Sequence, residues 1–240
     1  MAHRVLKTGE LMKVVERVDL IATGPFAASV EWREISDQVR AAVEQAEWPV
    51  GAGTFTIHPE SGKKSGMGNG VVPIKAKPMA VLKAAGWHLE FPWEMGERPD
   101  PAAKVKRAAE RAKKGTRPGD IDAARSFSQG LVVVEWETGN VSSSHRSINK
   151  MALGLVCKQC VAGVMVVPNM KLARYLTDRI GNIEELRSYF PMWRSLNVAN
   201  GVLELLVIEQ DAESVDVPRI PKGSDGRALK AAKIITVDDI

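Results

Sequence analysis

The spacing of apolar and polar residues predicts helices and short strands in the first half of the chain. In residues 31–47, apolar side chains recur at three- and four-residue intervals, as at Ile35, Val39 and Val43, and form one face of an amphipathic helix. Trp48-Pro49 is expected to end this helix, because the residue before a proline avoids the helical conformation. The same criteria predict a short strand at 53–58, a glycine-rich loop at 61–70, a helix at 74–86 established after Pro78, and a strand at 87–93.

The second half of the chain shows a more regular alternation. Residues 130–137, GLVVVEWE, are rich in β-branched side chains and predict a strand. They are followed by a predicted helix at 147–159, a buried strand at 161–167 closed by Pro168, helices near 170–180 and 183–195, and a strand at 201–209. This order predicts an α/β fold with a parallel crossover. The tail from Asp211 is rich in charge, proline and glycine, and is expected to stay outside the core.

Composition narrows the class of protein. The chain has 240 residues, of which 26% are charged and 45% hydrophobic, as expected for a globular protein with one full core. A formal charge of +4 permits a polyanionic partner without requiring one. No apolar run reaches the roughly 18 residues of a membrane span, and the N-terminus lacks the apolar core of a signal peptide. We therefore expect a cytoplasmic protein.

Two acidic residues end the predicted strand at 130–137. Because side chains alternate across a strand, Val133, Glu135 and Glu137 share one face, while Val132, Val134 and Trp136 share the other. Burying two unpaired carboxylates is costly, and a divalent cation removes that cost. Oxygen ligands suit magnesium, so the pattern suggests a Mg²⁺ site.

A third carboxylate lies upstream in the segment 119–137. If residues 120–126 pair with 131–137 in a hairpin that turns at Ser128-Gln129, position 122 falls opposite 135. A turn shifted by one residue puts 122 opposite 137. Either register brings Asp122 beside the two glutamates, with Asp120 one step outward on the same face as the second candidate. Three convergent carboxylates in a basic chain fit metal-assisted phosphodiester hydrolysis.

Asp122 followed by Glu135-Trp136-Glu137 resembles the active site of the PD-(D/E)xK nucleases. A glutamate in place of the usual lysine is similar to the BamHI- and BglII-like branch of type II restriction endonucleases. The resemblance implies a restriction-endonuclease-like core with a mixed central β-sheet flanked by helices. It also implies that Asp122 and Glu135 are metal ligands and that Glu137 lies near the attacking water.

The resemblance further implies an activity and an organisation for the whole chain. We expect one nuclease domain over 1–240, with a catalytic core at about 119–210, an N-terminal helical part at 1–118 and a charged tail at 211–240. The expected reaction is magnesium-dependent cleavage of double-stranded DNA at a short palindrome, whose two-fold symmetry favours a homodimer. The alternatives are a repair or structure-specific nuclease with the same chemistry and a DNA-binding protein that has the fold but does not cut. The helix at 183–195 is a candidate interface, although core packing explains its apolar residues equally well.

Several basic and polar residues are candidate DNA contacts. His145, Arg146 and Lys150 follow the acidic strand and are expected to approach the phosphate beside the metal, with solvated bases and serine N-caps as the alternative. Lys63, Lys64 and Asn69 lie in the glycine-rich loop, which is either a DNA contact or a flexible surface loop. The basic stretch at 104–117 tracks DNA or forms a solvated face.

The two cysteines, Cys157 and Cys160, form a lone CxxC motif. Zinc would require two further ligands, and the four histidines show no metal-ligand spacing. We expect both cysteines to be buried and reduced at a helix end.

Overall fold

The computed structural model describes residues 12–62, 67–93, 119–177 and 180–222. Its central sheet contains β1 (Lys13–Thr23), β3 (His88–Phe91), β4 (Ile121–Phe127), β5 (Gly130–Trp136), β6 (Ala162–Pro168) and β7 (Gly201–Glu209). The strand order is β1-β7-β6-β5-β4-β3. β5, β6 and β7 run parallel, whereas β1 pairs with β7, and β4 with β5 and β3, in antiparallel fashion. The sheet is therefore mixed, which confirms the expected fold class.

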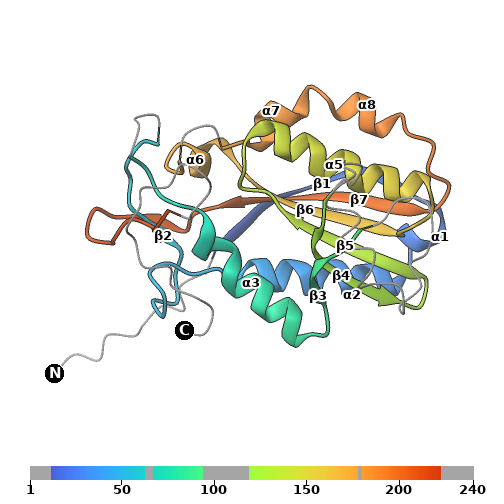
Figure 1. Ribbon diagram of the computed structural model, residues 1–240, viewed down its shortest axis with the longest axis horizontal. Coiled ribbons are helices and arrows are strands. Elements are labelled where there is room, and N and C mark those ends of the chain that lie inside the picture. Colours follow the sequence, from blue (N-terminus) through green and yellow to red (C-terminus); the bar gives the residue numbers. More distant parts are fainter. Residues whose placement is uncertain (1–11, 63–66, 94–118, 178–179, 223–240) are drawn as a thin grey trace, which may run out of the picture.

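Helices cover both faces of this sheet (Figure 1). α2 (Val30–Val43) and α3 (Val72–Ala84) lie on one face, and α5 (Val141–Val156), α7 (Ile183–Arg187) and α8 (Phe190–Arg194) lie on the other. The short helices α1 (Gly24–Ala27) and α6 (Met170–Ala173) complete the described set, together with a second, parallel sheet of β2 (Thr56–Ile57) and β8 (Ala212–Glu213). No helix in the described ranges is both long and apolar enough to cross a membrane.

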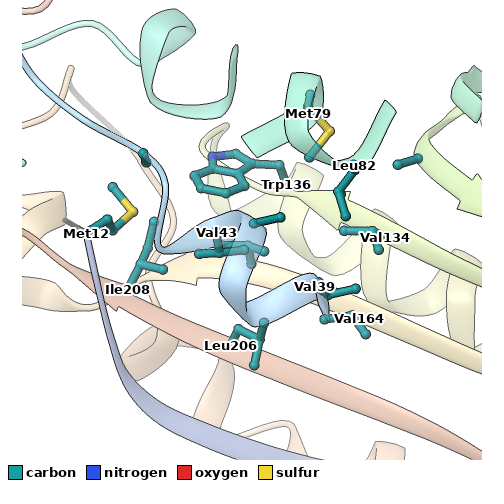
Figure 2. Packing of buried hydrophobic residues seen from close by; sticks show 14 of the residues in the cluster. Met12, Val39, Val43, Met79, Leu82, Val134, Trp136, Val164, Leu206 and Ile208 are labelled. Atoms are coloured by element: carbon teal, nitrogen blue, oxygen red, sulfur yellow. The ribbon is translucent and has the colours of Figure 1, made fainter. Parts of the chain in front are cut away.

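Because side chains alternate along β5, they contribute to two separate hydrophobic cores, one on each face of the sheet. Val132, Val134 and Trp136 belong to the core beneath α2 and α3, whereas Val133 belongs to the core beneath α5. Figure 2 shows Val134 and Trp136 beside Met79 and Leu82 of α3. Since both faces of β5 are covered, Glu135 and Glu137 lie at the margin of a packed layer, not on an open surface.

Within the N-terminal part at 1–118, the sequence reading missed a strand, because β1 is an edge strand of the main sheet. The hydrophobic pattern of β1 does not follow a regular two-residue period, because the strand is irregular. The pairing of β1 with β7 shifts register between Val14 and Glu16 and again between Asp19 and Ile21. Each such irregularity moves the following side chains to the other face and interrupts the two-residue period that identifies a strand.

Four helix predictions need correction. α3 begins at Val72, and Pro78 lies inside it. α5 begins at Val141 and not at 147, because the Asn140 side chain accepts a hydrogen bond from the Ser143 amide and caps the helix in place of the candidate serines. The helix at 170–180 shortens to α6, and the helix at 183–195 divides into α7 and α8. Pro191, in the first turn of α8, lacks the amide hydrogen that one continuous helix would require.

The C-terminal tail is partly ordered into the fold, contrary to expectation. β8 pairs with β2, and the Ile220 side chain is only 1% exposed in the core beneath α2 and α3. The Ile220 amide donates to Asn69 Oδ1 at 3.0 Å. Residues up to 222 therefore help to hold the region around β2. The basic stretch at 104–117 lies outside the described residues.

Candidate active site

The β4–β5 hairpin resolves which register brings the acids together. Ala123 pairs with Val134 and Phe127 with Gly130, so the turn lies at Ser128-Gln129. Continuing this register by one residue places Asp122 opposite Glu135. Of the two registers left open by the sequence, the hairpin adopts the first.

Asp122, Glu135 and Glu137 all line a cleft of about 440 Å³ at the end of β5. The cleft lies where β4, β5, α3 and the first turns of α5 meet, so it combines acids from the sheet with bases and hydroxyls from helices. The other charged or hydroxyl-bearing residues that line it are Lys75, Asp120, Thr138, Ser143, Arg146, Ser147 and Lys150.

The Asp122 carboxylate is fixed by two donors. Lys75 Nζ of α3 contacts Asp122 Oδ1 at 3.0 Å, and the Trp136 amide donates to Oδ2 at 2.7 Å. Asp120 also lines the cleft, but it is exposed to solvent. Its backbone carbonyl accepts a hydrogen bond from Lys150 Nζ at 2.7 Å. The structure thus orients Asp122, rather than Asp120, toward Glu135.

Glu135 is almost fully buried and forms an ion pair with Lys150 of α5. Burial raises the pKa of Glu135 from 4.5 to about 7. Lys150 opposes this increase, while the neighbouring Asp122 and Glu137 charges add to it. A second cation beside Glu135 would favour its ionised form.

This raised pKa predicts how the stability of the metal-free protein depends on pH. Native Glu135 retains its proton up to about pH 7, whereas the unfolded chain releases it near its ordinary value of 4.5. The free energy of unfolding should therefore fall by roughly 3 kcal/mol as the pH rises through this window, and change no further above it. Urea denaturation at several pH values measures the fall. Glu135→Gln is the comparison, since the variant has no proton to lose; equal pH dependence in both proteins would contradict the prediction.

Glu137 is held by a different kind of donor. Its Oε1 accepts from the Gly139 amide at 2.7 Å and from Ser143 Oγ at 2.9 Å, and its Oε2 accepts from Ser147 Oγ at 3.0 Å. Both serines belong to α5. Glu135 at the end of β5 and Glu137 directly after it therefore differ in their surroundings. Glu135 faces an ammonium group, whereas Glu137 faces neutral hydroxyl and amide donors near a helix N-terminus.

Comparison with known proteins identifies the family to which the chain belongs. The family model of restriction endonuclease BamHI matches residues 12–227. The chain belongs to the BamHI family of restriction endonucleases. It is 38% identical to the type II restriction enzyme OkrAI of Oceanobacter kriegii over 196 residues, covering 82% of this chain and 90% of that protein. It is 34% identical to the type II restriction enzyme BamHI of Bacillus amyloliquefaciens over 202 residues, covering 82% and 84%.

A solved structure agrees with this assignment at the level of the fold. Restriction endonuclease BglII, crystallised with a DNA 16-mer, superposes with a TM-score of 0.53 and 12% identity, covering 81% of this chain and 78% of that one. Membership of the BamHI family makes the protein a site-specific deoxyribonuclease of a restriction system and implies a divalent metal cofactor. The resemblance drawn from the sequence is confirmed.

The acids of the cleft fit a divalent cation of the kind that the BamHI family implies. Asp122 and Glu135 present oxygen ligands from adjacent strands to the same cleft. Magnesium commonly binds through one or two carboxylates, with water and substrate phosphate completing its coordination. Within the described residues, no three His, Cys, Asp or Glu side chains are grouped as a ready-made metal site. Asp122 and Glu135 are each paired with a lysine, and Glu137 with the serines of α5.

The candidate DNA contacts on α5 differ in their position. Arg146 is exposed and lines the cleft, which suits a contact with a phosphate. Lys150 also lines the cleft, but its side chain is only 5% exposed and is engaged by Glu135. The His145 ring packs edge-on against Tyr189, with 4.4 Å between ring centroids, and is 5.5 Å from the Trp193 ring. His145 is therefore in contact with α8 and is absent from the cleft lining.

The expectation that Asn69 contacts DNA needs correction. Asn69 is fully buried, and its side-chain amide donates to the carbonyls of His58 and Tyr175 while Oδ1 accepts from the Ile220 amide. These bonds tie three distant segments together and leave the side chain no access to a ligand. Lys63 and Lys64 lie outside the described residues.

Two cleft residues, Lys75 and Ser147, were not identified from the sequence, and Ser143 was considered only with its neighbouring serines as a loop donor or N-cap. Lys75 pairs with Asp122 across 47 sequence positions, and no local pattern indicates such a contact. Ser143 and Ser147 were detectable in principle, because they precede Lys150 by seven and three residues and so share one helix face with it. That inference required the correct start of α5.

The CxxC motif divides into two unlike cysteines. Cys160 is buried, and burial raises the pKa of its thiol to about 12, so it is expected to remain an unreactive core residue. Cys157 is exposed at the end of α5, so the expectation that both cysteines are buried is wrong for this residue.

Proposed function

We propose that this protein is a magnesium-dependent type II restriction endonuclease that cuts duplex DNA at a short palindrome, in the cytoplasm. The observation that carries the proposal is the joint placement of Asp122, Glu135 and Glu137 in one cleft, with Arg146 at its exposed side. Membership of the BamHI family supports the same activity. Asp122 and Glu135 would hold Mg²⁺, and Glu137 would accept a proton from the attacking water.

Each residue of the cleft has a role that follows from its position. When bound, Mg²⁺ supplies neutralisation of the phosphate charge and acidification of a nearby water. Lys75 and the Trp136 amide keep Asp122 in place. Arg146 would hold the DNA backbone by a charge-assisted hydrogen bond to a phosphate. The serines of α5 keep Glu137 directed at the cleft.

The test is incubation of the full-length protein with phage-length duplex DNA, with Mg²⁺ or with EDTA. Discrete fragments that appear with Mg²⁺ and are absent with EDTA would support the proposal, and their ends would give the recognition site. A continuous smear would contradict cleavage at a palindrome. Uncut DNA under both conditions, with folded protein that binds DNA, would contradict the proposed chemistry.

A two-fold symmetric site favours a homodimer, and the layer formed by α5, α7 and α8 offers a surface for it. Leu186, Phe190 and Trp193 of this layer are buried in the protein's own core. Four other apolar side chains of this layer are between 45% and 50% exposed: Leu153 and Val156 of α5, Met192 of α8 and Tyr189 directly before α8. We propose that a second copy of this chain covers them.

The double variant Leu153→Glu/Met192→Glu should convert the dimer to a monomer. Burying a carboxylate in an apolar interface costs more than 1 kcal/mol per site, so the dimer dissociation constant should rise about 100-fold or more. Sedimentation equilibrium measures this constant. Val30→Glu is the matched control, since Val30 is 59% exposed on α2, across the sheet. A double variant that dimerises like the wild type would exclude this surface.

A further inference from the structure

One face of α5 carries three polar residues that contact Glu135 at the end of β5 and Glu137 directly after it. Ser143, Ser147 and Lys150 are spaced by four and three residues, so they lie one above the other on the helix. Ser143 and Ser147 contact Glu137, whereas Lys150 contacts Glu135. α5 therefore gives hydroxyl donors to one glutamate and a positive charge to the other.

The contacts of Glu137 use most, but not all, of its capacity to accept hydrogen bonds. An ionised carboxylate offers about two acceptor positions on each oxygen. Both positions of Oε1 are used, by the Gly139 amide and by Ser143 Oγ. Oε2 accepts from Ser147 Oγ at 3.0 Å, which leaves one position of this oxygen for a group inside the cleft. Oε2 is thus the atom through which Glu137 can take a proton from water.

The two serines do not hold Glu137 equally. Ser143 Oγ lies 2.9 Å from Glu137 Oε1 and 2.7 Å from the Asn140 carbonyl, and its single proton serves one acceptor at a time. Oε1 also keeps the Gly139 amide as a second donor. Ser147 is only 4% exposed, and within the described residues Glu137 is the acceptor to which its hydroxyl donates. The direction of Oε2 therefore depends chiefly on Ser147.

We infer that Ser147 is a positioning residue for Glu137, whose hydroxyl fixes Oε2 so that its free acceptor position faces the water attacking the phosphodiester. The inference rests on the proposed function, in which Glu137 accepts the proton of that water. Ser147 itself does not contact substrate. Its effect is to prevent rotation of the carboxylate, and to do so without the positive charge that would weaken Glu137 as a base.

The test is single-turnover cleavage of duplex DNA by Ser147→Ala at saturating Mg²⁺. Loss of a hydrogen bond to a charged group should lower the cleavage rate about 10- to 100-fold. Affinity for the same DNA, measured by fluorescence anisotropy with Ca²⁺ in place of Mg²⁺, should stay within about twofold of the wild type, because the hydroxyl acts on Glu137 alone. Ser147→Thr keeps a hydroxyl at this position and should restore most of the rate.

The matched control is Ser144→Ala on the same turn of α5. Ser144 is fully buried like Ser147, but its hydroxyl is directed to the Asn140 carbonyl and does not line the cleft. The Ser144→Ala variant should cleave DNA at the wild-type rate. The cleavage rate should fall less in Ser143→Ala than in Ser147→Ala. The inference is overturned if Ser147→Ala cuts at the wild-type rate, or if the cleavage rate of Ser144→Ala falls as much as that of Ser147→Ala. It is also overturned if Ser147→Thr cuts no faster than Ser147→Ala.

Glu137→Ala separates this inference from the proposed function. If Glu137→Ala is inactive while Ser147→Ala cuts normally, Glu137 keeps its proposed role and the role of Ser147 is excluded. If Glu137→Ala itself cuts normally, the proposed role of Glu137 fails, and the role of Ser147 fails with it. Thermal unfolding of each variant shows whether a loss of rate comes with a loss of folded protein.

Discussion

Glu135→Gln should lower DNA cleavage at least about 1000-fold while leaving DNA binding intact. The variant keeps the shape of the side chain but removes the negative charge that would hold the cation beside Asp122. A bound metal ion contributes several kcal/mol to stabilising the charge of the transition state, and each 1.36 kcal/mol changes the rate tenfold. Cleavage of supercoiled plasmid and anisotropy of a labelled duplex in Ca²⁺ measure the two effects.

Binding should be retained because one negative charge is removed from a surface that meets phosphates. The matched control is Glu204→Gln, a buried glutamate of β7 that does not line the cleft. It should cut DNA within a fewfold of the wild-type rate when folded. Cleavage by Glu135→Gln above about 10% of the wild-type rate would exclude Glu135 as an essential metal ligand.

Arg17→Met should lower the free energy of unfolding at pH 7 by about 3 kcal/mol or more. Arg17 of β1 contacts Glu204 Oε1 through Nη2 at 2.6 Å and Nε at 2.9 Å, and Glu204 is 1% exposed. In the variant, Ser36 Oγ remains as a donor to Oε2 at 2.9 Å, but the buried charge has lost its counter-ion. Chemical denaturation measures the loss.

The loss should be smaller at acidic pH, and a second substitution should reverse it. Burial raises the pKa of Glu204 and Arg17 opposes this, so without Arg17 the carboxyl group can protonate and avoid part of the cost as the pH falls. Arg17→Met/Glu204→Gln removes the charge itself and should recover most of the stability. Arg187→Met is the control, because Arg187 and Glu16 are each 38% exposed, and such surface pairs contribute about 1 kcal/mol or less. Equal losses in Arg17→Met and Arg187→Met would show that burial of Glu204 carries no penalty.

The strands and the acidic pair of the site could be predicted because their signals are local. β5, β6 and β7 are runs of β-branched and apolar residues that only a buried strand accommodates. The two-residue period of β5 alone places Glu135 and Glu137 on one face. The position of Asp122 near them also followed, since either hairpin register brings it beside one of the two glutamates.

The features that distinguish the members of this site depend on packing between distant segments. Lys75 reaches Asp122 only because α3 packs across the end of β4, and Lys150 becomes buried only because α5 lies over β5. The sequence alone could not distinguish Asn69 from a surface loop residue, because the Ile220 amide that donates to it lies 151 positions away. The sequence determined which residues alternate and which can ionise, since those properties belong to single residues and their neighbours. The burial of each charge, its partner and therefore its chemistry were decided only by the tertiary structure, because they depend on what the rest of the chain brings into contact with it.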